Sequence, residues 1–197
     1  MFFADCVFEV CENVYEPAED SFMFAKRLQV RAGTRVLDMG TGTGLLGILA
    51  AKQASEVLSV DLNPYAVQCS RKNAQLNSTS NNMSFLQGDL FTPLAKTAKF
   101  DLIFFNAPYL PSEPVEEASW LARAWAGGAS GRQVIDRFIS QVTAHLEQSG
   151  EILLMQSNLA NIEETKVKFE AMGMKVKVVT QLALPFFETL ALLRATF

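Results

Sequence analysis

The feature that most constrains the fold is a glycine-rich turn that joins a short apolar strand to an apolar helix. The strand is expected at residues 35–38 and the helix at 45–53, with Met39-Gly-Thr-Gly-Thr-Gly44 between them. Glycines let the backbone turn sharply here and bring its N–H groups close to a ligand. This order of elements is typical of an open α/β sheet with a ligand crevice at its strand ends.

Apolar strands and helical segments alternate along the rest of the chain. Strands are expected at 35–38, 57–61, 83–86, 100–105, 151–155, 175–180 and 189–195, and helices at 17–28, 45–53, 64–76, 131–148 and 162–172. The alternation predicts a doubly wound, mostly parallel α/β sheet of seven strands. Only residues 181–188 separate the last two strands, so the final strand is expected to be antiparallel. With no linker in 197 residues, we expect a single domain, 1–197.

Charge and hydropathy narrow the classes of partner. The formal net charge is −4, and no basic cluster exceeds the pairs Lys26-Arg27 and Arg71-Lys72. Proteins that grip long nucleic acids usually present a basic surface, so direct nucleic-acid binding is not expected. No stretch approaches the roughly 20 apolar residues that span a bilayer. Asp5 interrupts an apolar start that has no basic n-region, so we expect no signal peptide and a cytoplasmic location.

The cysteines and the single histidine argue against metal chemistry. Cys6, Cys11 and Cys69 form no C-x-x-C pair, which favours buried, reduced thiols over a disulfide or a zinc site. His145, the only histidine, falls within an expected helix, where a surface or packing role is expected. These counts predict no metal site and no Ser-His-Asp triad.

Aspartates at the expected strand ends indicate the kind of ligand. The pattern Gly42-x-Gly44-x-x-Gly47 formally satisfies a dinucleotide-binding fingerprint, with Asp61 at a plausible distance. Asp38, two residues before the first glycine, would repel a pyrophosphate but suits a cationic ligand. The sulfonium and ammonium groups of S-adenosylmethionine are such a ligand. Asp61 ends the second strand and Asp89 the third, so we interpret the series as one cofactor crevice.

A second motif follows the fourth expected strand, which runs into Asn106-Ala107-Pro108-Tyr109. A plain turn is the simplest interpretation, since Asn and Pro favour turns. Beside a cofactor crevice, however, the Asn106 side-chain oxygen and the carbonyl of Ala107 can each accept one N–H of a substrate nitrogen. Orienting the substrate nitrogen in this way can supply much of the reduction in the activation barrier for transfer. Tyr109 can pack on the flat substrate group.

These motifs resemble those of known methyltransferases. The run from Asp38 to Gly44 resembles motif I of the class I S-adenosylmethionine-dependent enzymes, and the tetrapeptide resembles the N-P-P-Y motif of enzymes that methylate planar nitrogens. The segments 14–22 and 124–138 are similar to the HemK-related methyltransferases of eukaryotes and archaea. That family methylates N5 of the glutamine in the Gly-Gly-Gln motif of class I peptide-chain release factors. The resemblance therefore implies a Rossmann-like protein-glutamine methyltransferase.

The resemblance also implies roles by position. Cofactor contacts are implied at Ser21, Asp38, Gly40, Gly42, Asp61, Asp89, Leu90 and Asn106. A catalytic and substrate-binding clamp is implied at Asn106, Ala107, Pro108 and Tyr109, with Leu110 as a further substrate contact. Tyr15, Pro17 and Glu19, in an N-terminal segment 1–30, would close the pocket. Ala107 replaces a proline of the family but keeps the carbonyl, and Pro108 still favours an extended residue 107, so a softer site with the same role is expected.

A partner is implied as well. Members of the family work as heterodimers with a small zinc-binding activator that pairs along the outer strand of the sheet. The strand 83–86 is expected at an edge and contains no Lys or Pro. Such an edge is open to pairing with a second chain.

Other hypotheses remain open from the sequence. N6-methylation of adenine in DNA or RNA uses the same clamp, although the acidic charge and the lack of a target-recognition domain stand against it. Methylation of a lysine amine or of arsenite is chemically conceivable in an acceptor-lined pocket. A non-catalytic scaffold that binds cofactor and activator is favoured only by Ala107.

Overall fold

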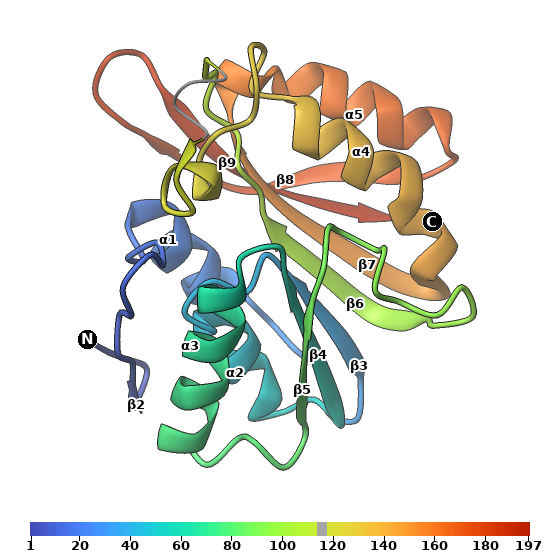
Figure 1. Ribbon diagram of the computed structural model, residues 1–197. Helices are drawn as coiled ribbons and strands as arrows, with labels where there is room; N and C mark the ends of the chain where they lie inside the picture. Colours follow the sequence, from blue (N-terminus) through green and yellow to red (C-terminus); the bar gives the residue numbers. More distant parts are fainter. Residues whose placement is uncertain (114–117) are drawn as a thin grey trace.

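The computed structural model describes residues 1–113 and 118–197, and its centre is one large sheet (Figure 1). In these residues the sheet has seven strands in the order β5-β4-β3-β6-β7-β9-β8. The strands are β3 (Arg35–Met39), β4 (Glu56–Asp61), β5 (Met83–Gln87), β6 (Phe100–Asn106), β7 (Leu146–Ser157), β8 (Lys175–Ala183) and β9 (Thr189–Thr196). The first five are parallel, and β9 runs antiparallel between β7 and β8. This confirms the predicted fold, including the edge position of 83–86.

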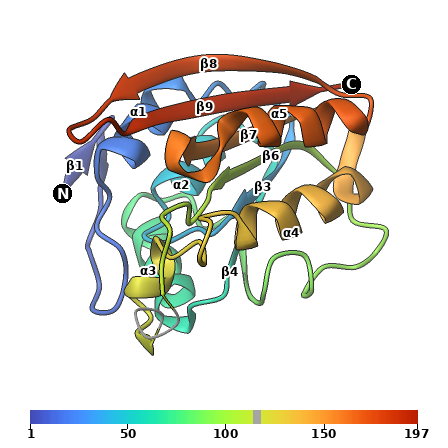
Figure 2. The same ribbon diagram turned by 90° about the horizontal axis from the view of Figure 1, so that it is seen from above.

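Helices cover both faces of the sheet. They are α1 (Glu19–Arg27), α2 (Leu45–Ala51), α3 (Pro64–Leu76), α4 (Gln133–Val142) and α5 (Ile162–Ala171). The first three pack into one apolar cluster, and α4 and α5 pack into the other, as the view from above shows (Figure 2). Successive strand residues alternate between the clusters: Phe104 faces the first and Phe105 the second. Strands buried on both faces explain the continuous apolar runs in the sequence.

The predicted helix 131–148 was too long at its C-terminal end. α4 ends at Val142, a short 3-10 turn follows at Thr143–His145, and β7 begins at Leu146. Leu146 pairs with Phe100 at the start of β6, so the chain must already be extended there. His145 is a packing residue: its ring stacks on Phe91 at 5.0 Å between centroids, and Nδ1 lies 2.9 Å from the carbonyl oxygen of Ala98.

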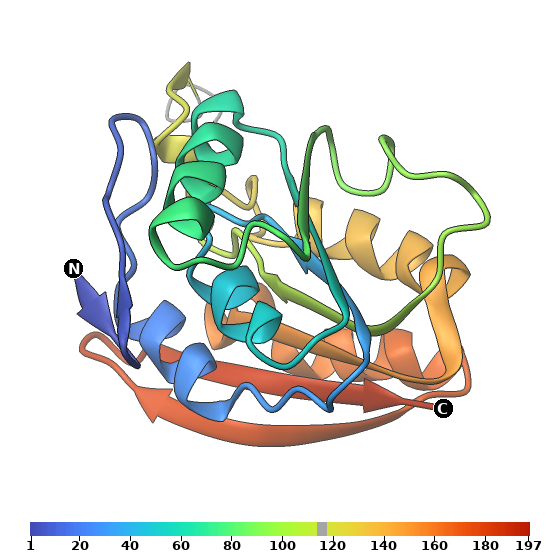
Figure 3. The same cartoon turned by 90° about the horizontal axis from the view of Figure 1, so that it is seen from below.

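The N-terminal segment contains two elements that the sequence did not predict, the short strands β1 (Phe2–Phe3) and β2 (Cys6–Val7). Beyond them the chain runs alongside α3, as the view from below shows (Figure 3). Asn73 of α3 hydrogen-bonds to the backbone of Glu9, and Asn77, the C-cap of the helix, to the backbone of Val7. The segment then continues to Val14, which packs against Ala66 in the first turn of α3, beside the carboxyl ends of the strands.

The prediction of three reduced thiols was wrong for two of them. Cys11 and Cys69 form a disulfide, with their Cα atoms 5.8 Å apart, while Cys6 is free and buried. The sequence gives no local signal for this pair, because 58 positions separate the two residues. They meet only because the N-terminal segment lies along α3.

Candidate active site

A cavity of about 360 Å³ opens at the carboxyl ends of β3, β4 and β6. Its walls come from the glycine turn, the start of α1, the N-terminal segment and the residues before α4. An open α/β sheet concentrates ligands at this edge, because the loops leaving parallel strands diverge there. The sequence also predicted a ligand crevice at these strand ends.

The glycine turn forms the floor of the cavity. Gly40, Gly42 and Gly44 all have positive φ, of 67°, 55° and 85°. A side chain at Gly40 would also lie 2.8 Å from the ring of Phe105. Only glycine satisfies both conditions, so the turn can lie flat against β6.

Asp38 holds this turn in shape. Its carboxylate is buried and accepts hydrogen bonds from Thr41 Oγ1 at 2.6 Å and Ser59 Oγ at 3.3 Å. Burial raises the pKa of Asp38 to about 7, although the hydrogen bond from Thr41 acts in the opposite direction and lowers the pKa. The negative charge of Asp61 raises the pKa further. Asp38 thus lines the cavity and also supports the loop.

Asp61 lies at the end of β4 and is partly exposed. One carboxylate oxygen accepts from the Gly42 N–H at 2.9 Å and the other from the Asn63 N–H at 2.8 Å. Burial raises its pKa to about 6. Asn63 caps α3 through the Tyr65 N–H, so one short segment orders both the acid and the helix.

Asp89 and Leu90 lie just beyond the end of β5, which stops at Gln87. Both residues line the cavity. Asp89 pairs with Arg137 of α4 at 2.5 Å, and Leu90 is buried with a φ of 49°. The Asp89–Arg137 pair joins the loop after β5 to α4.

Asn106 closes β6 and presents an oriented amide. Its Nδ2 donates to Asp20 Oδ2 at 2.9 Å and to Ser21 Oγ at 3.3 Å. Its Oδ1 is buried and, within the described residues, has no hydrogen-bond partner. A buried acceptor without a partner costs free energy unless a ligand supplies the donor.

Asp20 is the hub of this arrangement, although sequence reasoning did not select it. Besides Asn106, it accepts from the hydroxyls of Tyr15 at 3.3 Å and Tyr109 at 3.4 Å, and from the Ser21 N–H at 2.6 Å. Burial and then the charge of Asp20 raise the pKa of both phenols above the ordinary value. Both tyrosines therefore remain neutral hydrogen-bond donors near neutral pH.

A glycine-rich loop supports the segment after Asn106. Leu110 donates to the carbonyl of Trp125 at 2.9 Å and accepts from the Gly127 N–H at 2.8 Å. Gly131 has a φ of 71°, and a side chain there would collide with the carbonyl oxygen of Tyr109. The loop thus packs directly against the backbone of the predicted clamp.

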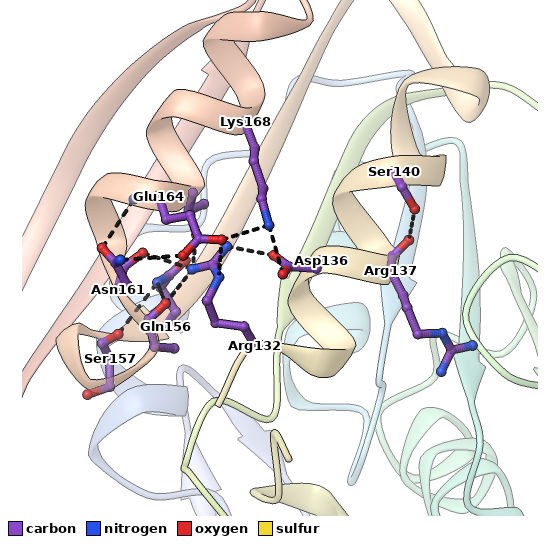
Figure 4. A network of polar contacts seen from close by, with 11 residues as sticks. Arg132, Asp136, Arg137, Ser140, Gln156, Ser157, Asn161, Glu164 and Lys168 are labelled. Carbon is purple, nitrogen blue, oxygen red and sulfur yellow. Dashed lines mark hydrogen bonds and ion pairs between the residues drawn. The ribbon is translucent and has the colours of Figure 1, made fainter. Parts of the chain in front are cut away.

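Arg132 anchors the end of this loop (Figure 4). Its buried guanidinium donates to the carbonyls of Ala160 and Asn161. It forms ion pairs with Asp136 at 2.7 Å and Glu164 at 3.2 Å, and Lys168 contacts both carboxylates. The network joins the start of α4 to α5.

The structure brings the predicted site residues together around one cavity. The lining includes Ser21, Asp38, Gly40, Gly42, Asp61, Asp89, Leu90, Asn106, Ala107, Pro108, Tyr109 and Leu110, together with Tyr15 and Pro17. Glu19 does not line it: the side chain is exposed, and its neighbour Asp20 points inward instead. A carboxylate in the first turn of a helix is common at the surface, so nothing in the local sequence distinguished Asp20 from Glu19.

Comparison with known proteins agrees with this geometry. A family model described as a methyltransferase domain matches residues 31–173. The chain is 42% identical to a protein of Methanocaldococcus jannaschii named as an N5-glutamine methyltransferase, over 91% of this chain and 90% of that protein. It is 34% identical to the human methyltransferase HEMK2, over 77% of this chain and 75% of that protein.

The fold also matches solved structures. The Mtq2–Trm112 complex of E. cuniculi, which is responsible for methylation of the eRF1 translation termination factor, contains a chain that aligns with a TM-score of 0.72. The alignment covers 93% of this chain and 98% of that one at 24% identity. At this identity it shows a shared fold and nothing more.

Proposed function

The chain belongs to the methyltransferase family that includes the protein N5-glutamine methyltransferases and HEMK2, and from that premise we propose that it methylates the glutamine of a Gly-Gly-Gln motif. The substrate is a class I peptide-chain release factor, and the product carries the methyl group on the side-chain nitrogen N5. The chain acts as a single domain, and its N-terminal segment 1–30 closes the pocket.

The observation that carries this proposal is the orphaned oxygen of Asn106. Its Oδ1 is buried without a partner among the described residues, while Nδ2 is fixed by Asp20 and Ser21. The amide therefore offers an acceptor and no free donor to the cavity. A primary amide nitrogen, which carries two N–H groups, meets this need.

The cavity suits S-adenosylmethionine as the methyl donor that membership of the family implies. When bound, this cofactor supplies an activated methyl group on a positively charged sulfur. Asp38, Asp61 and the backbone of Gly40 and Gly42 would hold it, because carboxylates and a glycine turn complement its charge and hydroxyl groups. Ser21, Asp89 and Leu90 would complete the site, with Asn106 at its junction with the substrate.

The chain's own residues would do the positioning. Asn106 Oδ1 accepts one N–H of the glutamine amide, and the carbonyl of Ala107 accepts the other. This fixes the nitrogen so that its out-of-plane lone pair faces the donor side of the cavity. Tyr109 packs on the flat amide, with Pro108 and Leu110 beside it. Ala107 is buried, so the neighbouring structure restrains the carbonyl that a proline ring would otherwise hold.

The exposed edge of the sheet is the proposed site of the activator subunit. β5 lies at one end of the strand order, and Ser84, Leu86 and Gln87 are exposed. A small zinc-binding protein could add a strand along this edge, since the strand carries neither Lys nor Pro. We propose a heterodimer of this kind.

A transfer assay tests the proposal. The protein, co-expressed with the activator, is expected to move a labelled methyl group to a release factor that carries Gly-Gly-Gln, and not to the same factor with Gln replaced by Ala. Adenine-containing nucleic acid, a lysine peptide and arsenite run in parallel. Labelling of any of these in place of the release factor would overturn the proposed substrate.

The clamp is tested separately. Asn106→Ala is expected to abolish transfer while changing the cofactor dissociation constant by no more than about a few-fold, because the lost interaction is made to the substrate nitrogen. Calorimetry measures the cofactor affinity. Loss of cofactor binding in the variant would make Asn106 mainly a cofactor residue.

A further inference from the structure

A half-exposed ion pair lies at the cavity, between the loop after β5 and helix α4. Arg137 Nη2 is 2.5 Å from Asp89 Oδ2, and both residues line the cavity. The Arg137 side chain extends from α4 away from the Arg132 network (Figure 4). The two side chains are 47% and 41% exposed, and a pair this exposed contributes little to folding because water screens its charges. Stability therefore does not explain why the pair lies at the cavity.

The loop that carries Asp89 is held in place by other contacts. The ring of Phe91 stacks on Phe138 of α4, with 5.5 Å between the two centroids. The Thr92 N–H donates to the carbonyl of Asp89 at 3.1 Å. None of these contacts involves the Arg137 guanidinium. The ion pair is thus not needed to hold the loop against the helix.

The pair leaves one oxygen of the carboxylate unused. Arg137 binds Oδ2 of Asp89, whereas Oδ1 has no hydrogen-bond partner within residues 1–113 and 118–197. A guanidinium is a rigid donor, so it restrains the orientation of the carboxylate that it binds. A restrained carboxylate with a free oxygen is a directed acceptor, which suits a ligand group that donates a hydrogen bond.

The cavity lining beside the pair is apolar and suits a flat ring. Leu90 follows Asp89 and is buried, and Val134 lies three positions before Arg137 on the same face of α4. Both line the cavity, together with Phe105. A planar heterocycle with an exocyclic amine could bury its ring against these side chains and donate from its amine to Asp89.

The charges along the cavity distinguish this end from the rest of it. Asp38, Asp61 and Asp89 lie at or just beyond the ends of neighbouring strands and line the cavity. Of these three, only Asp89 has a cationic partner in the described part of the chain, since the other two accept from hydroxyl and backbone N–H groups. A guanidinium would repel the positive groups of S-adenosylmethionine but is compatible with its neutral base. The position of Arg137 thus indicates where the base lies.

We propose that Arg137 is a positioning residue that holds Asp89 so that Oδ1 accepts a hydrogen bond from the exocyclic amine of the cofactor's adenine. The inference rests on the proposed function in one respect, the use of an adenosyl cofactor. It gives α4 a part in base recognition. The pair would favour a base with an amine at this position over one with a carbonyl, whose oxygen would face a fixed carboxylate.

Two ligands that differ at this end of the base test the inference. S-Adenosylhomocysteine carries the amine and S-inosylhomocysteine carries a carbonyl in its place, and neither has a methyl group to transfer. Calorimetry on the full chain measures both dissociation constants. We expect the wild type to bind the adenosyl ligand about tenfold to a hundredfold more tightly, as for a hydrogen bond to a charged group. Equal affinities would show that Asp89 does not recognise the amine and would overturn the inference.

Arg137→Met tests the positioning role. The variant is expected to bind the adenosyl ligand about tenfold more weakly and the inosyl ligand no more weakly than the wild type, so the preference falls to about threefold or less. Arg137→Lys keeps a cation and should recover part of the preference. Arg35→Met is the matched control, because the Arg35–Glu56 pair is similarly exposed and does not line the cavity. It should keep the full preference, and the melting temperature without ligand should change little in each variant.

The outcomes separate this inference from the proposed function. If Arg137→Met weakens both ligands equally, the arginine supports the cavity as a whole and does not position Asp89. If the wild type binds S-adenosylhomocysteine and Arg137→Met keeps the full preference for it, the inference is wrong and the proposed function stands. If the wild type binds neither ligand, the cofactor of the proposed function is wrong, and the inference fails with it.

Discussion

At the scale of single residues, Asp20 controls which end of the Asn106 amide faces the cavity. A carboxylate can only accept hydrogen bonds, so it requires Nδ2 to point toward it and Oδ1 to point away. An amide at position 20 could donate as well, and Asn106 could then turn over. Asp20→Asn is therefore expected to lower kcat by about tenfold to a hundredfold, since a hydrogen bond to a charged group contributes about 1.5–3 kcal/mol.

The measurement is single-turnover methyl transfer, with cofactor affinity determined separately. Glu19→Gln is the matched control, because it removes a neighbouring carboxylate that is exposed and does not line the cavity. An unchanged rate in Asp20→Asn would mean that Ser21 alone orients Asn106.

Asp38 gives a prediction on pH. Its pKa rises from 3.8 to about 7 on folding, chiefly through burial. The folded state therefore binds the proton more tightly, and this contribution to stability is full below pH about 4 and lost as pH rises through about 7. Ionised, the buried group costs up to about 4 kcal/mol.

Asp38→Asn removes this dependence. In the absence of cofactor, the melting temperature of the variant relative to the wild type is expected to increase between pH 5 and pH 8, as followed by circular dichroism. Glu147→Gln, which changes an exposed carboxylate, should show no such trend. A relative melting temperature that is equal at both pH values would show that Asp38 is ionised throughout.

At the scale of elements, the sequence predicted the strands well, because their apolar runs are long and β3, β4 and β5 end at or directly before a glycine or an aspartate. The strand ends of the site were predictable for the same reason: Asp38, Asp61 and Asn106 follow directly from the strand boundaries. The hub at Asp20 and the Cys11–Cys69 disulfide were not predictable, since both join segments that are distant in the chain. α4 ends earlier than predicted because Leu146 pairs with β6. The helical periodicity of the sequence carries no signal for that pairing.

The Arg132 network predicts how α4, α5 and the clamp depend on one another. Arg132 is 5% exposed, so its loss would leave Asp136 and Glu164 with only Lys168 between them. Arg132→Met is expected to lower the free energy of unfolding by about 3 kcal/mol. Transfer should also slow under conditions where the variant is fully folded, because Gly131 would no longer be held against Tyr109.

Urea unfolding measures the first effect and single-turnover kinetics the second. Arg35→Met is the matched control: Arg35 pairs with Glu56 with both side chains about half exposed, and such a pair contributes less than about 1 kcal/mol. If Arg132→Met loses stability but keeps the wild-type transfer rate, the Arg132 network does not hold the clamp in position.

At the scale of the whole molecule, the site combines parts from both ends of the chain. Within the described residues, no helix has the length and apolarity to cross a bilayer. The buried apolar side chains fill two large clusters on opposite faces of the sheet. The cavity lies at one edge of that sheet. Of the parts of the chain that form its wall, the N-terminal segment has the smallest apolar cluster of its own.

The disulfide therefore predicts a link between oxidation state and cofactor affinity. Cys11–Cys69 ties the segment that carries Val14, Tyr15 and Pro17 to α3, and it closes a loop of 58 positions. Chain entropy alone gives such a link about 4 kcal/mol of stabilisation. Reductant is expected to lower the melting temperature of the wild type and to weaken cofactor binding by several-fold, because the wall of the cavity becomes less ordered.

Cys11→Ser should reproduce both effects and lose the response to reductant, while Cys6→Ser keeps it, since Cys6 is free in the structure. The fold itself should persist, because Asn73 and Asn77 still bind the backbone of the segment. If reductant changes neither the melting temperature nor the affinity of the wild type, the two thiols are unpaired in solution. The wall would then depend on those hydrogen bonds and on the packing of Val14 against Ala66.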